Sequence, residues 1–208
     1  MLNRFIDQFS RMIYRLEDLL FDFKYNIRTS KPIIGLEGIT IESEFIANGQ
    51  PYQGAYLRNV RKLLKVMYEE DTSHGVETYI DLGCGLGRTC FYAYTTGKFK
   101  TVLGVDFGKE FIKQANVFQI KTFNFSNIQF IEKDVAKLIL PDTNSFLFAF
   151  NPFDAVVFEK LFLNNIQTLK NNKIYLGYSN DRYAIDIQNY FSVVYRDPKR
   201  KLSLWVSK

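Results

Sequence analysis

From residue 78 onward, short runs rich in β-branched and aromatic residues alternate with helical segments. The strand-like runs are predicted at residues 78–82, 101–106, 128–132, 145–150 and 173–178, and the helices at residues 88–96, 109–123 and 154–169. Such alternation is typical of a parallel sheet with helices on both faces. Two further runs, 191–195 and 202–206, flank a turn at 197–200 and predict an antiparallel hairpin at one edge of the sheet. Residues 71–208 are therefore predicted to form one α/β domain with a seven-stranded, mostly parallel sheet.

Residues 1–70 are predicted to be a helical extension that caps this domain. Large apolar residues recur there at alternating spacings of three and four: Leu2, Phe5, Phe9, Met12, Leu16, Leu19 and Phe23. This pattern predicts an amphipathic helix that ends before Pro32. We expect it to pack on its own domain through this apolar face, with a dimer seam or a partner-binding helix as the alternative. A second helix is predicted at residues 53–70, after a loop at 32–51 that contains at most a short strand near 39–41.

A glycine-rich turn lies where the first predicted strand of the sheet ends and a helix begins. It reads Asp81-Leu82-Gly83-Cys84-Gly85-Leu86-Gly87-Arg88. Glycines there allow positive φ and let the loop backbone lie close to a bound ligand, and the N–H groups at the start of the helix face the anionic part of that ligand. The dinucleotide fingerprint requires G-x-G-x-x-G, whereas here the third glycine comes one residue early. The turn therefore indicates a nucleoside site and disfavours a nicotinamide-dependent oxidoreductase.

Acidic residues also end the next two predicted strands. Asp106 follows Asp81 by 25 positions, where an acid accepts hydrogen bonds from ribose hydroxyls. Asp134 comes after the third strand and is placed to accept from an adenine amino group, while the Val135 backbone N–H donates to the ring. The carboxyl ends of parallel strands meet at the edge where such sheets bind ligands, so these acids predict one site.

With these residues the sequence resembles the class I S-adenosylmethionine-dependent methyltransferases, over residues 75–180. The resemblance implies a Rossmann-like fold and S-adenosyl-L-methionine as cofactor. It also implies the cofactor contacts, which are Asp81, Gly83, Gly85 and Gly87 in the loop, Asp106 at the ribose, and Asp134 with Val135 at the adenine. Tyr52, with Gln53 and Tyr56, is placed either to cover the methionine end of the cofactor or to pack in the core. The loop and these tyrosines also resemble the non-SET lysine methyltransferases, which usually have Glu at the position of Asp106.

The segment Asn151-Pro152-Phe153 follows the fourth predicted strand of the sheet and matches the family motif that lines the methyl-transfer site. It is similar to the Asn/Asp-Pro-Pro-Tyr/Phe motif of amino-methylating members, with one proline missing. The resemblance makes Asn151, Pro152 and Phe153 the candidate catalytic residues, with Asn151 orienting an acceptor amine and Phe153 packing against the acceptor. A turn that merely ends a strand is the alternative.

Composition sets the remaining expectations. The 208 residues are 47% hydrophobic and carry a net charge of +5, which excludes disordered, fibrous and disulfide-rich classes. The sequence has only two cysteines, no secretory signature, no apolar stretch of about 20 residues and no Cys/His spacing for zinc, so we expect a cytoplasmic protein without metal or membrane. His74 is expected in a loop.

The resulting functional prediction is methyl transfer from S-adenosylmethionine to a nitrogen of a protein side chain, nucleobase or small molecule, by a monomer or homodimer. A nucleic-acid acceptor is not favoured on the moderate positive charge alone. The alternative is a non-catalytic cofactor-binding or adaptor protein of the same fold, which engages a partner through the N-terminal helix.

Overall fold

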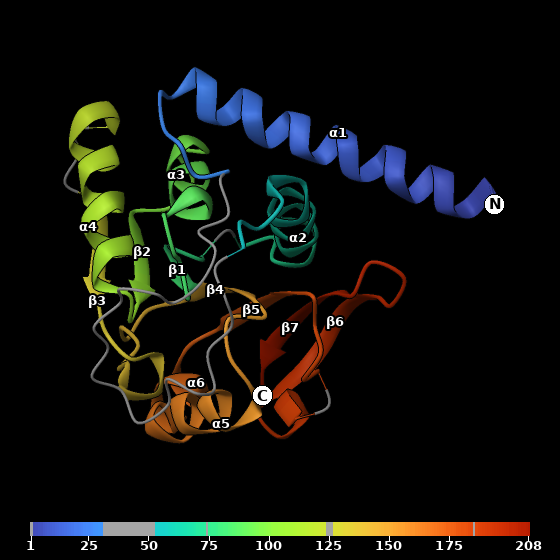
Figure 1. Ribbon diagram of the computed structural model, residues 1–208. Coiled ribbons are helices and arrows are strands. Elements are labelled where there is room, and N and C mark those ends of the chain that lie inside the picture. The colour runs from blue at the N-terminus through green and yellow to red at the C-terminus, as the bar shows by residue number, and fades with distance from the viewer. Residues whose placement is uncertain (1, 31–52, 74, 124–126, 185) are drawn as a thin grey trace.

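The computed structural model describes residues 2–30, 53–73, 75–123, 127–184 and 186–208, and in the first helix the side chains from Phe9 onward. Seven strands form one sheet in the order β3-β2-β1-β4-β5-β7-β6 (Figure 1). The strands are β1 (Thr78–Leu82), β2 (Thr101–Asp106), β3 (Ile128–Glu132), β4 (Ser145–Phe150), β5 (Ile174–Ser179), β6 (Phe191–Asp197) and β7 (Leu202–Ser207). The first five are parallel, and β7 and β6 are antiparallel to their neighbours. The predicted Rossmann-like α/β sheet with an antiparallel edge hairpin is confirmed.

Each face of the sheet has its own apolar core, because alternate strand residues point to opposite sides. Tyr79 and Phe146 pack on one face with α2 (Leu57–Glu70), α3 (Arg88–Thr95) and α4 (Lys109–Phe118). Ile80 and Leu147 pack on the other face with α5 (Ala155–Asn164) and the short helix η3 (Val135–Lys137). Helices on both faces leave only the strand ends for a ligand, and the strand order reverses between β1 and β4, where such sheets bind ligands.

Two predicted helices are interrupted in the structure. After α4 the chain continues as a π-helical segment, η2 (Gln119–Phe123), and the predicted helix 154–169 is divided into α5 and α6 (Ile166–Asn171). Asn165 lies between these two helices, and its side chain accepts from Leu140 N–H at 2.7 Å and donates to the carbonyls of Leu138 and Leu161, both at 2.7 Å. Asn165 thus satisfies backbone groups of a neighbouring loop at the point where the helix is interrupted.

The N-terminal helix α1 (Leu2–Lys24) lies across α2 and α3 as an outer layer (Figure 1). The face that meets the domain differs from the predicted one. Tyr14 packs edge-on against Tyr56, Phe21 contacts Tyr92, and Asp18 is buried. The predicted packing residues Phe9, Met12, Leu16, Leu19 and Phe23 are instead 52–86% exposed. The helix docks on the domain as predicted, but from Phe9 onward the predicted buried face was wrong, because buried ion pairs and the rings of Tyr14 and Phe21, not the apolar stripe, hold the helix to the domain. The side chains of Leu2 and Phe5 lie outside the described residues.

No helix in the described part of the chain is long and apolar enough to cross a membrane. The predicted strand near residues 39–41 and the predicted loop position of His74 lie outside the described residues.

Candidate cofactor and methyl-transfer site

The glycine loop between β1 and α3 has the backbone that its sequence predicts. Gly83, Gly85 and Gly87 have φ values of 81°, 51° and 79°, in the region that favours glycine. A Cβ atom on Gly83 would lie 2.4 Å from Pro152 Cβ, and one on Gly87 would lie 2.5 Å from the ring of Phe130. Glycine is therefore needed at these two positions both for conformation and for space, and the loop passes directly beside the segment after β4.

Asp106 ends β2 and faces this loop. Its Oδ2 accepts a hydrogen bond from Gly85 N–H at 2.8 Å, and its Oδ1 accepts one from Gly108 N–H at 2.8 Å. Burial raises the pKa of this carboxyl to about 6, against the lowering effect of these backbone donors. Each carboxylate oxygen retains a lone pair, so the residue fits the ribose of a nucleoside bound at the strand ends.

The side chain of Asp81, expected to contact the cofactor, is instead bound to another part of the protein. Its carboxylate is buried and accepts a short hydrogen bond from Thr89 Oγ1, in the first turn of α3. Burial, with the nearby charge of Asp106, raises the pKa of Asp81 to about 7. The side chain therefore ties β1 to α3 and shapes the loop from behind. Cys84 is also buried within the loop, and burial raises the pKa of its thiol well above the usual range, as suits a small packing residue.

The predicted adenine residues follow β3. Asp134 caps the helix η3 by accepting from Ala136 N–H at 2.9 Å, and Val135 is buried beside it. β3 lies next to β2 in the sheet, with Glu132 in register with Asp106. The three acidic residues Asp81, Asp106 and Asp134 thus lie at or just after the carboxyl ends of three adjacent strands, although the side chain of Asp81 is bound to Thr89. Tyr52 lies outside the described residues.

Asn151 and Pro152 extend from the end of β4 toward the glycine loop. Asn151 is buried in the left-handed region, with φ 44°, and its Oδ1 accepts a long hydrogen bond of 3.5 Å from Tyr178 Oη. Burial raises the pKa of Tyr178, so this phenol stays protonated. Phe153 is buried and its ring packs on Phe158, at 4.7 Å between centroids. The expectation that Phe153 packs against an acceptor is corrected, because its ring belongs to the core.

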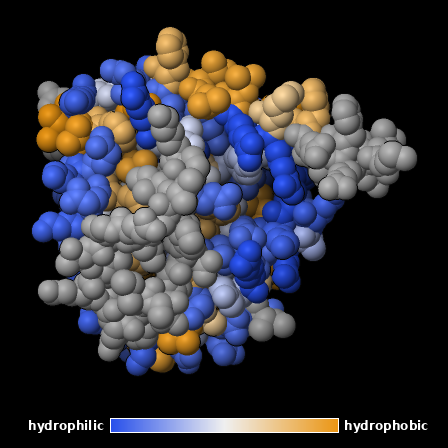
Figure 2. Space-filling view, viewed as in Figure 1, coloured by the Kyte–Doolittle hydropathy of each residue, from blue (hydrophilic) through white to orange (hydrophobic). Residues whose placement is uncertain are grey.

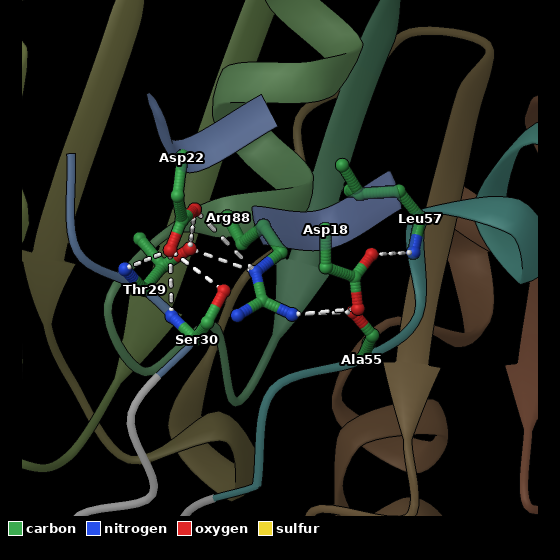
Figure 3. A network of polar contacts seen from close by, with 7 residues as sticks. All are labelled: Asp18, Asp22, Thr29, Ser30, Ala55, Leu57 and Arg88. Atoms are coloured by element: carbon green, nitrogen blue, oxygen red, sulfur yellow. Dashed lines mark hydrogen bonds and ion pairs between the residues drawn. The ribbon is translucent and has the colours of Figure 1, made fainter. Parts of the chain in front are cut away.

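A buried ion network adjoins the loop and was not predicted from the sequence (Figure 3). Arg88, the first residue of α3, is 4% exposed. Its Nε donates to Thr29 Oγ1 at 2.7 Å, and its Nη1 donates to Asp18 Oδ2 at 3.1 Å and to the Ala55 carbonyl at 3.2 Å. Asp22 lies 3.9 Å from the same Nε. Arg88 thus joins the cofactor loop to α1 and to the segment before α2.

The two acids of this network also order the backbone around them. Asp22 accepts from both the N–H and the hydroxyl of Thr29 and of Ser30, at 2.6–2.8 Å. Asp18 accepts from Leu57 N–H at 3.0 Å, at the start of α2. Burial raises the pKa of Asp18 to about 6, although Arg88 opposes this shift. The only signal of this network in the sequence is the arginine that directly follows the last glycine of the motif.

Comparison with known proteins identifies the class. The model of a family described as a methyltransferase domain matches residues 73–188, which is more than half of the chain. The chain therefore belongs to this methyltransferase domain family. The match covers all the strand-end residues described above and leaves out α1 and α2.

Solved structures show the same fold at low sequence identity. Magnesium protoporphyrin IX methyltransferase from Synechocystis PCC 6803, solved with bound S-adenosylmethionine, is 12% identical, with a TM-score of 0.50 over 73% of this chain and 77% of that chain. A putative RNA methyltransferase from Pyrococcus horikoshii is 13% identical, with a TM-score of 0.52 over 83% and 90%. A SAM-dependent methyltransferase from Leishmania major is 14% identical, with a TM-score of 0.51 over 72% and 71%. No curated protein sequence matches the chain.

Proposed function

We propose that this protein transfers the methyl group of S-adenosylmethionine to a nitrogen atom of its acceptor. Membership of the methyltransferase domain family supports methyl transfer, and the residues present suit this cofactor. The observation that carries the nitrogen acceptor is the position of Asn151, a buried amide held in a left-handed turn beside the glycine loop. When bound, the cofactor supplies an electrophilic methyl carbon and a neutral leaving group, so the protein has chiefly to position the reactants.

In this proposal Asp106 accepts hydrogen bonds from the ribose hydroxyls, and Asp134 and the Val135 N–H hold the adenine. The loop from Gly83 to Gly87 lies along the amino-acid part of the cofactor, and Asp81 fixes the shape of this loop. Asn151 offers its remaining acceptor capacity, with the adjoining backbone carbonyls, to the hydrogens of an acceptor amine, and so directs the nitrogen lone pair toward the methyl carbon. Pro152 keeps this segment against Gly83, and Phe153 holds it from the core side.

Replacing Asn151 with Ala is expected to lower the turnover rate about 100-fold while leaving S-adenosylhomocysteine affinity within a few-fold of the wild-type value. The reason is that the nucleoside contacts lie on other strands, whereas positioning of the acceptor depends on this amide. The acceptor is first located by incubating cell lysate with cofactor labelled in the methyl group and separating protein, nucleic acid and small molecules. Single-turnover rates and calorimetry then compare the variant with wild type, and an unchanged rate would show that Asn151 only ends the strand.

Cofactor affinity is also expected to decrease below pH 6. The ionised carboxylate of Asp106 accepts two hydroxyl hydrogens, and its pKa of about 6 means that protonation begins to remove an acceptor oxygen as the pH falls through this value. Between pH 7 and pH 5 the ionised fraction falls from about 90% to about 10%, which predicts up to a tenfold loss of affinity. Calorimetric titration with S-adenosylhomocysteine at each pH measures this affinity. In Asp106→Asn, which cannot titrate there, this pH dependence should be much reduced, and equal dependence in both proteins would assign it to another group such as Asp81.

A further inference from the structure

The free face of α1 carries a continuous row of apolar side chains. Six large residues on it are 52–86% exposed: Phe9, Met12, Leu16, Leu19, Leu20 and Phe23. Figure 2 shows hydrophobic atoms along the upper edge of the molecule, where Figure 1 places α1. Six such side chains, each about half exposed or more, present roughly 600–800 Å² of apolar surface. A monomer seldom leaves a patch of this size free, so it marks a binding surface.

This face is held outward by the rest of the structure. The opposite face of the helix is fixed to the domain by the buried pair of Asp18 and Arg88 and by the ion pair of Glu17 with Arg58. In Figure 1 the described part of the domain lies on one side of α1 and leaves the other side open along its length. The row runs from Phe9 to Phe23, and at a rise of about 1.5 Å per residue these positions span about 21 Å along the helix. The apolar row of the anchored helix therefore lies on the outside of the molecule, where a flat surface can contact it.

The charges beside the row favour an anionic surface. Among the side chains described in α1, the three acids Glu17, Asp18 and Asp22 all face the domain, where arginines pair with them. From Phe9 onward, the exposed charged residues of the helix are Arg11, Arg15 and Lys24. Arg15 borders the row, because it lies three residues after Met12 and four before Leu19, and Lys24 borders its other side, four residues after Leu20. From Phe9 to Lys24, the exposed side of the helix therefore carries apolar side chains with basic residues beside them and no exposed acid.

We propose that α1 docks the protein on an anionic lipid surface, with its apolar row in the headgroup region and its basic residues on the lipid phosphates. Interfacial helices have this composition, with Phe and Leu on one face and Lys or Arg beside it. A second copy of the chain is the weaker occupant, since pairing of the described parts of two helices would place basic residues of one copy along those of the other without an exposed acid between Phe9 and Lys24 to pair with them. The expectation of a protein without membrane contact rested on the lack of a spanning or secreted segment in the sequence. Peripheral docking requires neither.

Flotation of the full-length protein with lipid vesicles tests this proposal. We expect binding to vesicles of equal parts phosphatidylglycerol and phosphatidylcholine, weakening in high salt, and at least tenfold weaker binding to phosphatidylcholine alone. Leu16→Gln combined with Leu19→Gln and Phe23→Gln is expected to reduce binding 100-fold or more. Arg11→Gln with Arg15→Gln is expected to reduce it about 10- to 30-fold on the anionic vesicles.

The matched control removes exposed apolar side chains elsewhere. Ile120→Gln with Val193→Gln changes residues that are 71% and 55% exposed outside α1, and should leave vesicle binding unchanged. Far-ultraviolet circular dichroism and the melting temperature check that each variant is folded. Vesicle binding is measured without cofactor or acceptor, so its result does not depend on methyl transfer. The proposal is overturned by a folded wild-type protein that ignores anionic vesicles, by equal binding to both lipids, or by sedimentation that shows a dimer which the triple variant dissociates while vesicle binding persists.

Discussion

Replacing Arg88 with Met is expected to lower the free energy of unfolding by about 3–5 kcal/mol and to loosen α1 from the domain. The substitution keeps most of the side-chain volume but leaves Asp18 and Asp22 buried without their cation, and removal of one partner from a buried ion pair has this cost. The hydrogen bonds to Thr29 and to the Ala55 carbonyl are lost as well. Urea unfolding gives the stability, and amide hydrogen exchange in α1 reports its release.

The pH dependence of this loss identifies its cause. Arg88 lowers the pKa of Asp18, which burial raises to about 6, so the variant should have a still higher pKa at this carboxyl. A carboxyl whose pKa is raised by folding binds its proton more tightly in the folded state, so lowering the pH through that value stabilises the fold. The deficit of Arg88→Met should therefore be smaller at pH 5 than at pH 8. A deficit that is constant with pH would assign the effect to packing.

Two further variants serve as controls. Lys100→Met removes a cation whose side chain is 74% exposed and pairs with Glu77, and should change stability by no more than about 1 kcal/mol. Arg88→Lys should recover little of the lost free energy of unfolding, because an ammonium group cannot reproduce the separate hydrogen bonds that Nε and Nη1 make to Thr29, Asp18 and Ala55. Wild-type stability in Arg88→Met would mean that the network does not hold the helix.

The strands were predicted well because each buried strand appears in the sequence as a short run of apolar residues. Every residue of β1 is buried, and nearly all of β4 as well, so each strand is a short apolar run with clear ends. The carboxyl ends of such strands lie at one edge whatever the details of packing. Asp106 and Asp134 could therefore be placed there from the sequence. The role of Asn165 could not be predicted, since two of its three backbone partners lie on a loop about 25 residues earlier and the third lies in the preceding helix α5.

The orientation of α1 depends on a residue that is remote in sequence. The apolar row predicts an amphipathic helix, and acids such as Asp18 and Asp22 ordinarily mark the solvent face of one. Here Asp18 is buried because Arg88, 70 positions away, meets it inside the protein. Periodicity shows that two faces differ but does not show which one the domain binds. The same remote pairing turns the apolar face outward and creates the surface proposed for lipid docking.

Replacing Asp106 with Ala is expected to weaken S-adenosylhomocysteine binding by 100-fold or more while the domain remains folded. Two hydrogen bonds from the ribose to a carboxylate contribute about 1.5–3 kcal/mol each, and their loss corresponds to at least this factor. The substitution also frees the N–H groups of Gly85 and Gly108, so the loop loses the contact that shapes it for the nucleoside. Burial disfavours the ionised carboxylate and raises its pKa to about 6, so its removal offsets part of the cost of leaving these two N–H groups without an acceptor, and we expect the domain to remain folded. Calorimetry measures the affinity, and thermal unfolding shows that the domain is intact.

Glu132→Ala is the matched control for this effect. Glu132 is the acid in register with Asp106 on the neighbouring strand β3, but its side chain is exposed and lies one strand further from the glycine loop. Its removal changes the net charge by the same amount at the same edge of the sheet and should leave affinity within about twofold, because an exposed charge at that distance is largely screened. A similar loss in both variants would indicate a general electrostatic effect on the ligand. An unchanged affinity in Asp106→Ala would move the ribose site away from β2, and with it the methyl-transfer geometry proposed around Asn151.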